Sequence, residues 1–181
     1  MLPIKIANLV LRDFRASDVG EYQKVRDDSK FQRFYSEEDS SLEKSGQLIR
    51  AFIDQSHDTP RTKFQFAITL DSGTLIGSCG IRLEGSGTAS IGCEVGRHWH
   101  GSGAAREAGL AIIEFGFRDL GVTSIYAETI SENIAAIRLC RTLGMRQTHV
   151  RDNDRSFKGR TWSTAVLELS RSVWRETHAG T

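Results

Sequence analysis

The sequence predicts one α/β (α+β) domain with a mixed, mostly antiparallel sheet, and three observations support this. Its 181 residues, 39% of them apolar, are enough for a single domain with a sizeable core. Strand-like runs at 64–70 and 75–83 flank an Asp-Ser-Gly-Thr turn, which predicts an antiparallel hairpin. A further strand-like run, a glycine-rich turn, an amphipathic helix and a strand-like run at 122–130 predict a right-handed βαβ unit. We therefore expect the order β-α-α-β-β-β-α-β-α-β-β within one domain over residues 1–181.

Two helices are predicted near the beginning of the chain. Ser17 and the acidic residue after it can cap a helix that ends near Asp28. A second helix is predicted after Ser41, where apolar residues recur at helical spacing. Phe34 and Tyr35 lie between these helices in a predicted loop.

The glycine-rich turn is the most informative part of the chain. A strand pattern breaks at Gly96, and residues 100–105 (HGSGAA) then lead directly into a helix. The first N–H groups of a helix have no intrahelical partner and carry partial positive charge, which favours a phosphate group as ligand. No lysine followed by Ser or Thr closes the turn, and Arg106 stands where a dinucleotide-binding fingerprint has its third glycine. Both common nucleotide-binding motifs are therefore disfavoured, and a nucleotide-binding protein of another type remains an alternative.

Two motifs carry a resemblance to a known family. Residues 100–108 (HGSGAAREA) are similar to the Q/R-x-x-G-x-G/A turn of the GNAT superfamily of N-acetyltransferases, and to W-G-x-G-Y-A-T-E-A in its ribosomal-protein N-acetyltransferase (RimJ/RimL-like) branch. Residues 133–145 (NIAAIRLCRTLGM) are similar to the family's N-x-x-S/A-x-x-L-Y-x-x-x-G-F motif. With weaker matches near both ends, the chain is identified by resemblance as a member of this branch, which does not define the substrate.

The resemblance implies a GNAT fold of about seven strands and about four helices, in which the strands near residues 90–96 and 122–130 splay apart around acetyl-CoA. It implies acetyl transfer to a primary amine by direct attack in a ternary complex. The residues expected to bind coenzyme A are Val95, His100, Gly101, Ser102, Gly103, Ala104, Ala105 and Asn133.

Acetyl transfer to an amine requires loss of a proton, support for an oxyanion and departure of a thiolate. Glu94 is our candidate general base because the family often places its base on this strand. An ordinary glutamate is a weak base toward an ammonium, so we expect relay through ordered water. Alternatively, Glu94 only pairs with a neighbouring arginine. By resemblance, the Val95 N–H would support the oxyanion, whereas Cys140 would either protonate the leaving thiolate or pack in the core.

The resemblance implies that the acceptor is a protein N-terminal α-amine or a small-molecule amine, and polyamines, aminoglycosides and free amino acids are all compatible with the sequence. The resemblance suggests that Phe34, Tyr35 and Trp162 line its pocket, although core packing is the alternative for any aromatic residue. A noncatalytic acyl-CoA-binding or regulatory module is the competing function, because Cys140 stands where the family often has tyrosine.

Composition disfavours several other classes. A net charge of +1, from 24 basic and 23 acidic residues that are interspersed, argues against nucleic-acid or membrane partners. Three cysteines without a C-x-x-C pair indicate neither disulfides nor zinc, and His98 and His100 have no recognised metal-ligand spacing. The beginning of the chain shows no signal-peptide pattern. We therefore expect a soluble cytoplasmic enzyme that uses acetyl-CoA without a metal, and a homodimer is possible by resemblance alone.

Overall fold

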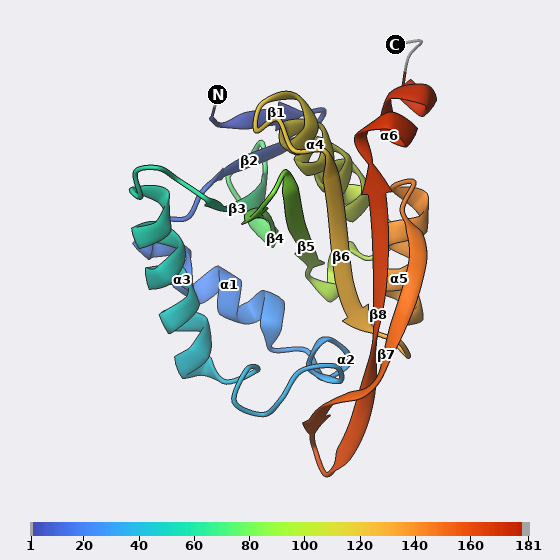
Figure 1. The fold of residues 1–181 in the computed structure, drawn as a ribbon. Helices are drawn as coiled ribbons and strands as arrows, with labels where there is room; N and C mark the ends of the chain where they lie inside the picture. Colours follow the sequence, from blue (N-terminus) through green and yellow to red (C-terminus); the bar gives the residue numbers. More distant parts are fainter. Residues whose placement is uncertain (1, 179–181) are drawn as a thin grey trace. The chain divides into compact units, whose positions relative to one another are not determined.

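The computed structural model describes residues 2–178 and contains, within them, eight strands, six α-helices and two short 3-10 helices (Figure 1). The strands are β1 (Ile4–Ile6), β2 (Leu9–Asp13), β3 (Lys63–Leu70), β4 (Leu75–Gly85), β5 (Thr88–Val95), β6 (Ser124–Ile130), β7 (Arg146–Phe157) and β8 (Arg160–Ser170). The helices are η1 (Ala16–Asp18), α1 (Val19–Arg26), α2 (Ser29–Gln32), α3 (Leu42–Ser56), η2 (Arg97–Trp99), α4 (Ala104–Arg118), α5 (Ile134–Thr142) and α6 (Arg171–His178).

The strands are hydrogen-bonded in the order β1-β2-β3-β4-β5-β6-β8-β7. The pair β5/β6 is parallel, whereas β1/β2, β2/β3, β6/β8 and β7/β8 are antiparallel. This confirms the predicted mixed, mostly antiparallel sheet, which has one more strand than expected because the short β1 pairs with β2 at the edge.

The parallel pairing of β5 with β6 is short. It joins Thr88 to Ser124, Ala89 to Ile125 and Ser90 to Tyr126. Both strands continue beyond this register, β5 to residue 95 and β6 to residue 130. The parallel register thus ends at Ser90 and Tyr126, in the region where the family resemblance implies that the two strands splay apart.

The chain divides into two compact units. The first contains Met1–Gly80 and Cys93–Ala111, and the second contains Ile81–Gly92 and Ile112–Thr181. Strands β4 and β5 and helix α4 each contribute residues to both, so the units are not consecutive segments. The single domain over residues 1–181 stays a prediction.

In the first unit, α1 and α3 lie side by side (Figure 1). Their buried faces share a core with β3, β4 and the residue that follows β2, Phe14. In this core Phe14, Tyr22 and Phe52 make ring contacts at 5.3–6.3 Å. As predicted, Ser41 caps α3, because its hydroxyl accepts a hydrogen bond of 3.1 Å from the Lys44 N–H.

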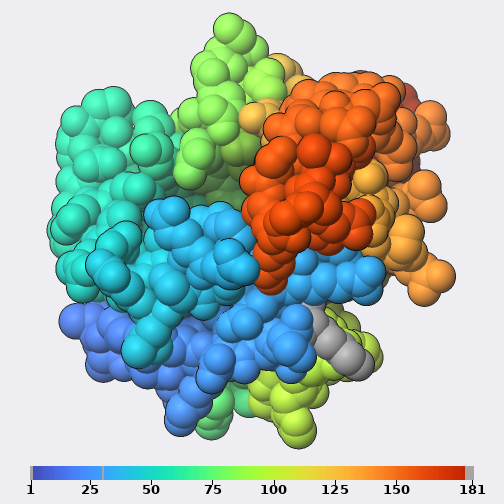
Figure 2. Space-filling view, turned by 90° about the horizontal axis from the view of Figure 1, so that it is seen from below, coloured from blue at the N-terminus to red at the C-terminus, as the bar shows by residue number. Residues whose placement is uncertain are grey.

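Helix α2 lies where the sequence predicts a loop. The carboxylate of Asp28 accepts the N–H of Phe31 at 3.0 Å, which stabilises the first turn of this four-residue helix. So short a helix shows no periodicity in a sequence. The segment between α1 and α3, light blue in Figure 2, forms part of the molecular surface.

In the second unit, β6 and β8 bury one face, and β7 forms a long hairpin with β8 (Figure 1). Helix α6, absent from the predicted order, packs Trp174 against Phe117 with ring centroids 5.3 Å apart. None of the helices formed by residues 2–178 has the length and apolar character needed to cross a bilayer.

Candidate active site

The end of β5 lies against the backbone of β4. The Gly96 N–H donates a hydrogen bond of 2.8 Å to the Ile76 carbonyl. A Cβ atom added to Gly77 would lie 2.2 Å from the Glu94 carbonyl oxygen and 2.9 Å from the Val95 Cα. Only glycine permits this approach, so Gly77 helps to position the backbone of Glu94 and Val95.

The side chain of Glu94 extends into a polar cluster and is 14% exposed. Its Oε1 accepts hydrogen bonds from the Tyr22 hydroxyl at 2.6 Å and from the Ser78 hydroxyl at 3.0 Å. Its Oε2 lies 3.5 Å from Nη1 of Arg26. The arginine pairing that the sequence left open is thus present, and a role of Glu94 in proton transfer stays a proposal.

The partners of Glu94 are themselves hydrogen-bonded. Ser78 accepts a hydrogen bond from the Gln65 amide at 3.3 Å while it donates to Glu94. Tyr22 accepts from Arg26 Nη1 at 3.2 Å while it donates to Glu94. Burial and the adjacent Glu94 charge hold the pKa of Tyr22 well above its usual value, so this phenol is a neutral donor.

Arg26 lies in the middle of the cluster with a side chain 6% exposed. Its guanidinium is 5.5 Å from the ring centroids of Tyr22, Phe31 and Tyr35, and Nη2 donates to the Asp39 carbonyl. Burial disfavours the charge, but Glu94, Tyr22 and Tyr35 together outweigh burial and raise the pKa of Arg26 above its ordinary value. Arg26 therefore carries a permanent charge inside the unit.

Of the aromatic residues predicted to meet the acceptor, the structure brings Tyr35 to this cluster. Its ring stacks on Phe31 at 4.8 Å, and burial together with Glu94 raises the pKa of its hydroxyl above the usual range. Phe34, half-buried, contacts the Arg33 guanidinium at 5.1 Å. The use of either residue in acceptor binding stays a prediction.

The glycine-rich turn joins β5 to α4, as predicted. Gly101 and Gly103 have φ values of +82° and +91°, which side chains other than glycine rarely adopt. The Ser102 hydroxyl donates to the Trp99 carbonyl at 2.8 Å and accepts the Ala104 N–H at 3.3 Å. The turn is therefore a defined cap before the helix.

The turn is also tied to the end of β5. The ring nitrogen Nε2 of His100 lies 3.0 Å from the Val95 carbonyl and donates to it in the tautomer protonated at that atom. On the same strand, the Cys93 thiol points to the Ala105 carbonyl at 3.8 Å. The first unit thus brings Glu94, Val95 and residues 100–105 together, as the sequence predicts.

Asn133 and Cys140 belong to the second unit and lie at the two ends of α5. Asn133 caps this helix, since its Oδ1 accepts the Ala136 N–H at 3.2 Å. Cys140 is buried, and burial raises the pKa of its thiol to about 11. So weak an acid favours the packing alternative for Cys140 over proton donation.

Trp162 is 5% exposed in the β7–β8 hairpin. Phe157 stacks on its ring at 5.0 Å, and the Arg160 guanidinium lies 3.8 Å from the ring centroid. The chain's own side chains therefore cover Trp162, and its contact with an acceptor stays a prediction.

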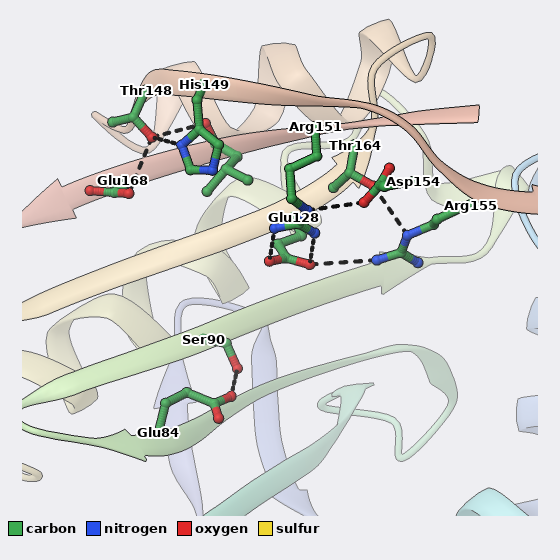
Figure 3. A network of polar contacts seen from close by, with 11 residues as sticks. Glu84, Ser90, Glu128, Thr148, His149, Arg151, Asp154, Arg155, Thr164 and Glu168 are labelled. Atoms are coloured by element: carbon green, nitrogen blue, oxygen red, sulfur yellow. Dashed lines mark hydrogen bonds and ion pairs between the residues drawn. The ribbon is translucent and has the colours of Figure 1, made fainter. Parts of the chain in front are cut away.

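The same unit carries a polar network that the sequence did not indicate (Figure 3). The Arg151 guanidinium donates two hydrogen bonds of 2.9 Å to Glu128, which also pairs with Arg155 at 3.5 Å. The hydrogen bonds from Arg151 lower the pKa of Glu128.

Across residues 2–178, no group of three or more His, Cys, Asp or Glu side chains is arranged to hold a metal ion.

Sequence reasoning missed Tyr22, Arg26 and Ser78. Tyr22 and Arg26 are separated by one helical turn, which is a weak signal that two side chains share a face. Nothing local relates them to Glu94, 72 positions from Tyr22 in the chain.

The structure thus has a short parallel β5/β6 register, a glycine-rich turn at the start of α4 and a carboxylate near the end of β5. The acetyltransferase (GNAT) domain model matches residues 8–146, well over half of the chain. The chain therefore belongs to the GNAT acetyltransferases and is an N-acetyltransferase of that family.

Relatives and solved structures agree with this assignment. The "uncharacterized N-acetyltransferase p20" of Bacillus licheniformis is 28% identical over 124 residues, which are 67% of this chain and 69% of that protein. The "uncharacterized N-acetyltransferase YnaD" of Bacillus subtilis is 27% identical over 150 residues, 80% and 82% of the two chains.

Solved structures share the fold at lower identity. A GNAT-family acetyltransferase from Bacillus anthracis has a TM-score of 0.81 and 19% identity, covering 94% of this chain and 99% of its own. RimJ of Mycobacterium smegmatis, in complex with CoA-disulfide, has a TM-score of 0.78 and 18% identity, covering 98% and 93%. Spermidine N-acetyltransferase of Vibrio cholerae, in complex with CoA and spermine, has a TM-score of 0.78 and 17% identity, covering 93% and 98%.

Proposed function

We propose that this protein transfers the acetyl group of acetyl-CoA directly to a primary amine, within a ternary complex of enzyme, acetyl-CoA and acceptor. The observation that carries this proposal is the position of Glu94. It is a largely buried carboxylate one residue before the end of β5, on the strand that His100 ties to the glycine-rich turn. An amine and a thioester would both be within reach of such a strand end.

The turn has the properties that a coenzyme A pyrophosphate requires. A Cβ atom at Gly101 would meet nothing within 4 Å, and residues 101–103 are exposed, so a phosphate could approach the turn from outside. The N–H groups of Ser102 and Ala104 already donate within the turn, to the Trp99 carbonyl and the Ser102 hydroxyl. We assign coenzyme binding to the turn, Val95, His100, Gly101, Ser102, Gly103, Ala104 and Ala105, and to Asn133. When bound, the thioester supplies the activated acetyl group.

Each remaining step needs a protein group. We propose that the Glu94 carboxylate takes the acceptor's proton through an ordered water, and that the Val95 N–H supports the oxyanion. The ion pair with Arg26 and the two hydroxyl donors hold the Glu94 carboxylate in place at the end of the strand. A relay through water, which spreads the proton over several acceptors, is compatible with such a carboxylate.

We propose that the acceptor is a protein N-terminal α-amine or a small-molecule amine, with Phe34, Tyr35 and Trp162 as candidate contacts. Membership of the ribosomal-protein (RimJ/RimL-like) branch is supported by the turn sequence and by the fold shared with RimJ at 18% identity. We further propose a cytoplasmic location, in keeping with three cysteines that form no C-x-x-C pair, and, by the family resemblance, a homodimer.

The experiment measures thiol release from acetyl-CoA with a panel of amines and N-terminal peptides, alongside thermal shifts with acetyl-CoA, coenzyme A, ATP and NAD. We expect stabilisation by the two coenzyme A compounds and amine-dependent release, with Glu94→Gln lowering kcat while leaving the acetyl-CoA affinity nearly unchanged. Stabilisation without release by any acceptor supports the noncatalytic module instead. Stabilisation by ATP or NAD alone overturns the assignment of the turn.

A further inference from the structure

The guanidinium of Arg26 occupies a recess that has the chemistry of an ammonium receptor. Three aromatic rings surround it, those of Tyr22, Phe31 and Tyr35, each with its centroid 5.5 Å from the guanidinium carbon. The Glu94 carboxylate and the Asp39 carbonyl provide acceptors at the same place. Aromatic faces combined with a carboxylate and a carbonyl bind organic cations of any origin, not only arginine.

The fit of Arg26 to this recess is incomplete. Its Nε is buried and has no hydrogen-bond partner among the residues that the structure describes. Leaving a buried charged donor unpaired is unfavourable, and apolar residues that replace both members of a buried ion pair often do so without loss of stability. Packing alone therefore does not account for an arginine at this position.

The position of Arg26 has a consequence for charge. Both oxygens of Glu94 have partners inside the unit, since Oε1 receives two hydroxyl donors and Oε2 faces the guanidinium. The positive charge nearest to Glu94 is thus supplied by the chain itself. An acceptor with a second ammonium would have to compete with Arg26 for the same carboxylate and the same rings.

We propose that Arg26 is a specificity residue: its guanidinium fills the place beside Glu94 that the second ammonium of a diamine would otherwise occupy, and so the enzyme selects acceptors with a single cationic amine. This inference rests on the proposed function. Arg26 acts on acceptor choice by excluding a cation from the aromatic recess and by holding Glu94 in position through the Tyr22 hydroxyl.

The test compares kcat/KM for putrescine and cadaverine with kcat/KM for butylamine and pentylamine, in the parent enzyme, Arg26→Ala and Arg26→Lys. We expect the diamine-to-monoamine ratio to rise about tenfold or more in Arg26→Ala, because a buried cation–carboxylate contact surrounded by aromatic rings contributes at least that factor. Arg26→Lys, which keeps a cation in the recess, should keep the parent ratio.

Arg61→Met is the matched control. Arg61 also pairs with a carboxylate, that of Asp13 at 2.6 Å, and also lies over aromatic rings, those of Phe64 and Phe66 at 4.7 and 5.6 Å. Its loss should leave the diamine-to-monoamine ratio unchanged. If the loss of any buried arginine had this effect, the diamine-to-monoamine ratio would change in both Arg26→Ala and Arg61→Met.

A second readout does not depend on turnover. Ethylguanidinium at millimolar concentration should raise the melting temperature of Arg26→Ala while leaving the parent and Arg61→Met unaffected. In the separate turnover assay it should also return the diamine-to-monoamine ratio of Arg26→Ala to the parent value. Should Arg26→Ala fail to fold, the same binding measurement is made with Arg26→Ala/Glu94→Gln, in which the carboxylate is neutral. In this double variant the recess is empty, so diamines should raise the melting temperature more than they do in Arg26→Lys/Glu94→Gln. A smaller rise than in Arg26→Lys/Glu94→Gln would show that the recess accepts no cation and would overturn the proposal.

Failure of the inference is distinguishable from failure of the proposed function. If the parent acetylates monoamines but Arg26→Ala shows the parent ratio and no response to ethylguanidinium, Arg26 does not set specificity. If the parent acetylates no amine, the proposed function itself fails, and the ethylguanidinium measurement still reports whether the recess binds a cation.

Discussion

The hydroxyl of Tyr22 donates a hydrogen bond of 2.6 Å to Glu94, joining α1 to the end of β5. The ring of Tyr22 lies in the apolar core with Phe14, whereas its hydroxyl lies at the border of that core. One side chain therefore couples the packing of the helix to the orientation of the carboxylate. Substitutions that disturb the packing of this core should therefore also change the orientation of Glu94.

Tyr22→Phe removes the hydroxyl and keeps the ring. We expect the free energy of unfolding to fall by about 1–2 kcal/mol, because Glu94 and Arg26 each lose a buried partner. We also expect kcat to fall by more than KM changes, because the carboxylate is less well oriented. Urea unfolding and steady-state thiol release measure the two effects. An unchanged kcat would show that the orientation of Glu94 is not limiting.

Gly77→Ala places a methyl group against the backbone of Glu94 and Val95, at 2.2 Å from a carbonyl oxygen. Because backbone atoms cannot move aside as a side-chain end can, we expect a loss of about 3 kcal/mol or more in stability and loss of activity. Gly92→Ala, on the neighbouring strand β5, is the control, since a Cβ there meets nothing within 4 Å. Equal stabilities in urea for the two variants would contradict the close approach of β4 and β5.

Gly103→Asp and Gly103→Asn have nearly the same shape but differ in charge. Aspartate and asparagine both tolerate a positive φ better than most other non-glycine residues do. The backbone strain at φ +91° is therefore similar in the two variants. We expect acetyl-CoA affinity to fall further in the aspartate variant, by about tenfold relative to the asparagine variant at low salt, and the difference to shrink at high salt. Calorimetric titration measures it. Equal acetyl-CoA affinities in the two variants would show that the coenzyme phosphates do not bind at this turn.

Cys140→Ala tests the thiol as a proton donor. Burial raises the pKa of Cys140 to about 11, so at pH 8 about one thiol in a thousand is ionised and alkylation should be slow. We expect the variant to lose about 1 kcal/mol of stability through the small cavity and to keep its kcat. A fall in kcat that grows with pH would restore Cys140 as the acid.

Asp18 makes the stability of the first unit pH-dependent. Burial opposes its ionisation, but hydrogen bonds from Arg12 at 2.8 Å and from the Arg15 N–H at 2.7 Å outweigh burial and lower its pKa below 3.8. With the folded-state pKa depressed, the contribution is fully present above about pH 4 and is lost as pH falls through the folded-state value. Asp18→Asn should unfold with a flatter pH dependence below about pH 4 than the parent. If stability fell with pH at the same rate in the parent and in Asp18→Asn, the role of Asp18 would be contradicted.

Local patterns predicted most of the fold. The cap at Ser41, the hairpin of β3 and β4, and the glycine-rich turn before α4 each depend on residues that are near one another in the chain. The cap that Asn133 makes on α5 was not predicted. The predictions failed for β1, α2 and α6, where elements of three to eight residues show too little periodicity to stand out.

The sequence by itself determined the order of the elements, the turn that precedes α4 and the presence of a carboxylate at the end of β5, because hydrophobic spacing and glycine's freedom at positive φ act over short stretches of chain. Only the tertiary structure decided what surrounds that carboxylate. Tyr22 and Arg26 come from α1, and Ser78 comes from β4. Tyr22, which donates a hydrogen bond to Glu94, is 72 positions away in the chain, and Ser78, which does the same, is 16 positions away. Arg26 forms an ion pair with the same carboxylate. The packing of α1 against the sheet sets these contacts, and no local pattern encodes which side chains of two packed elements will meet.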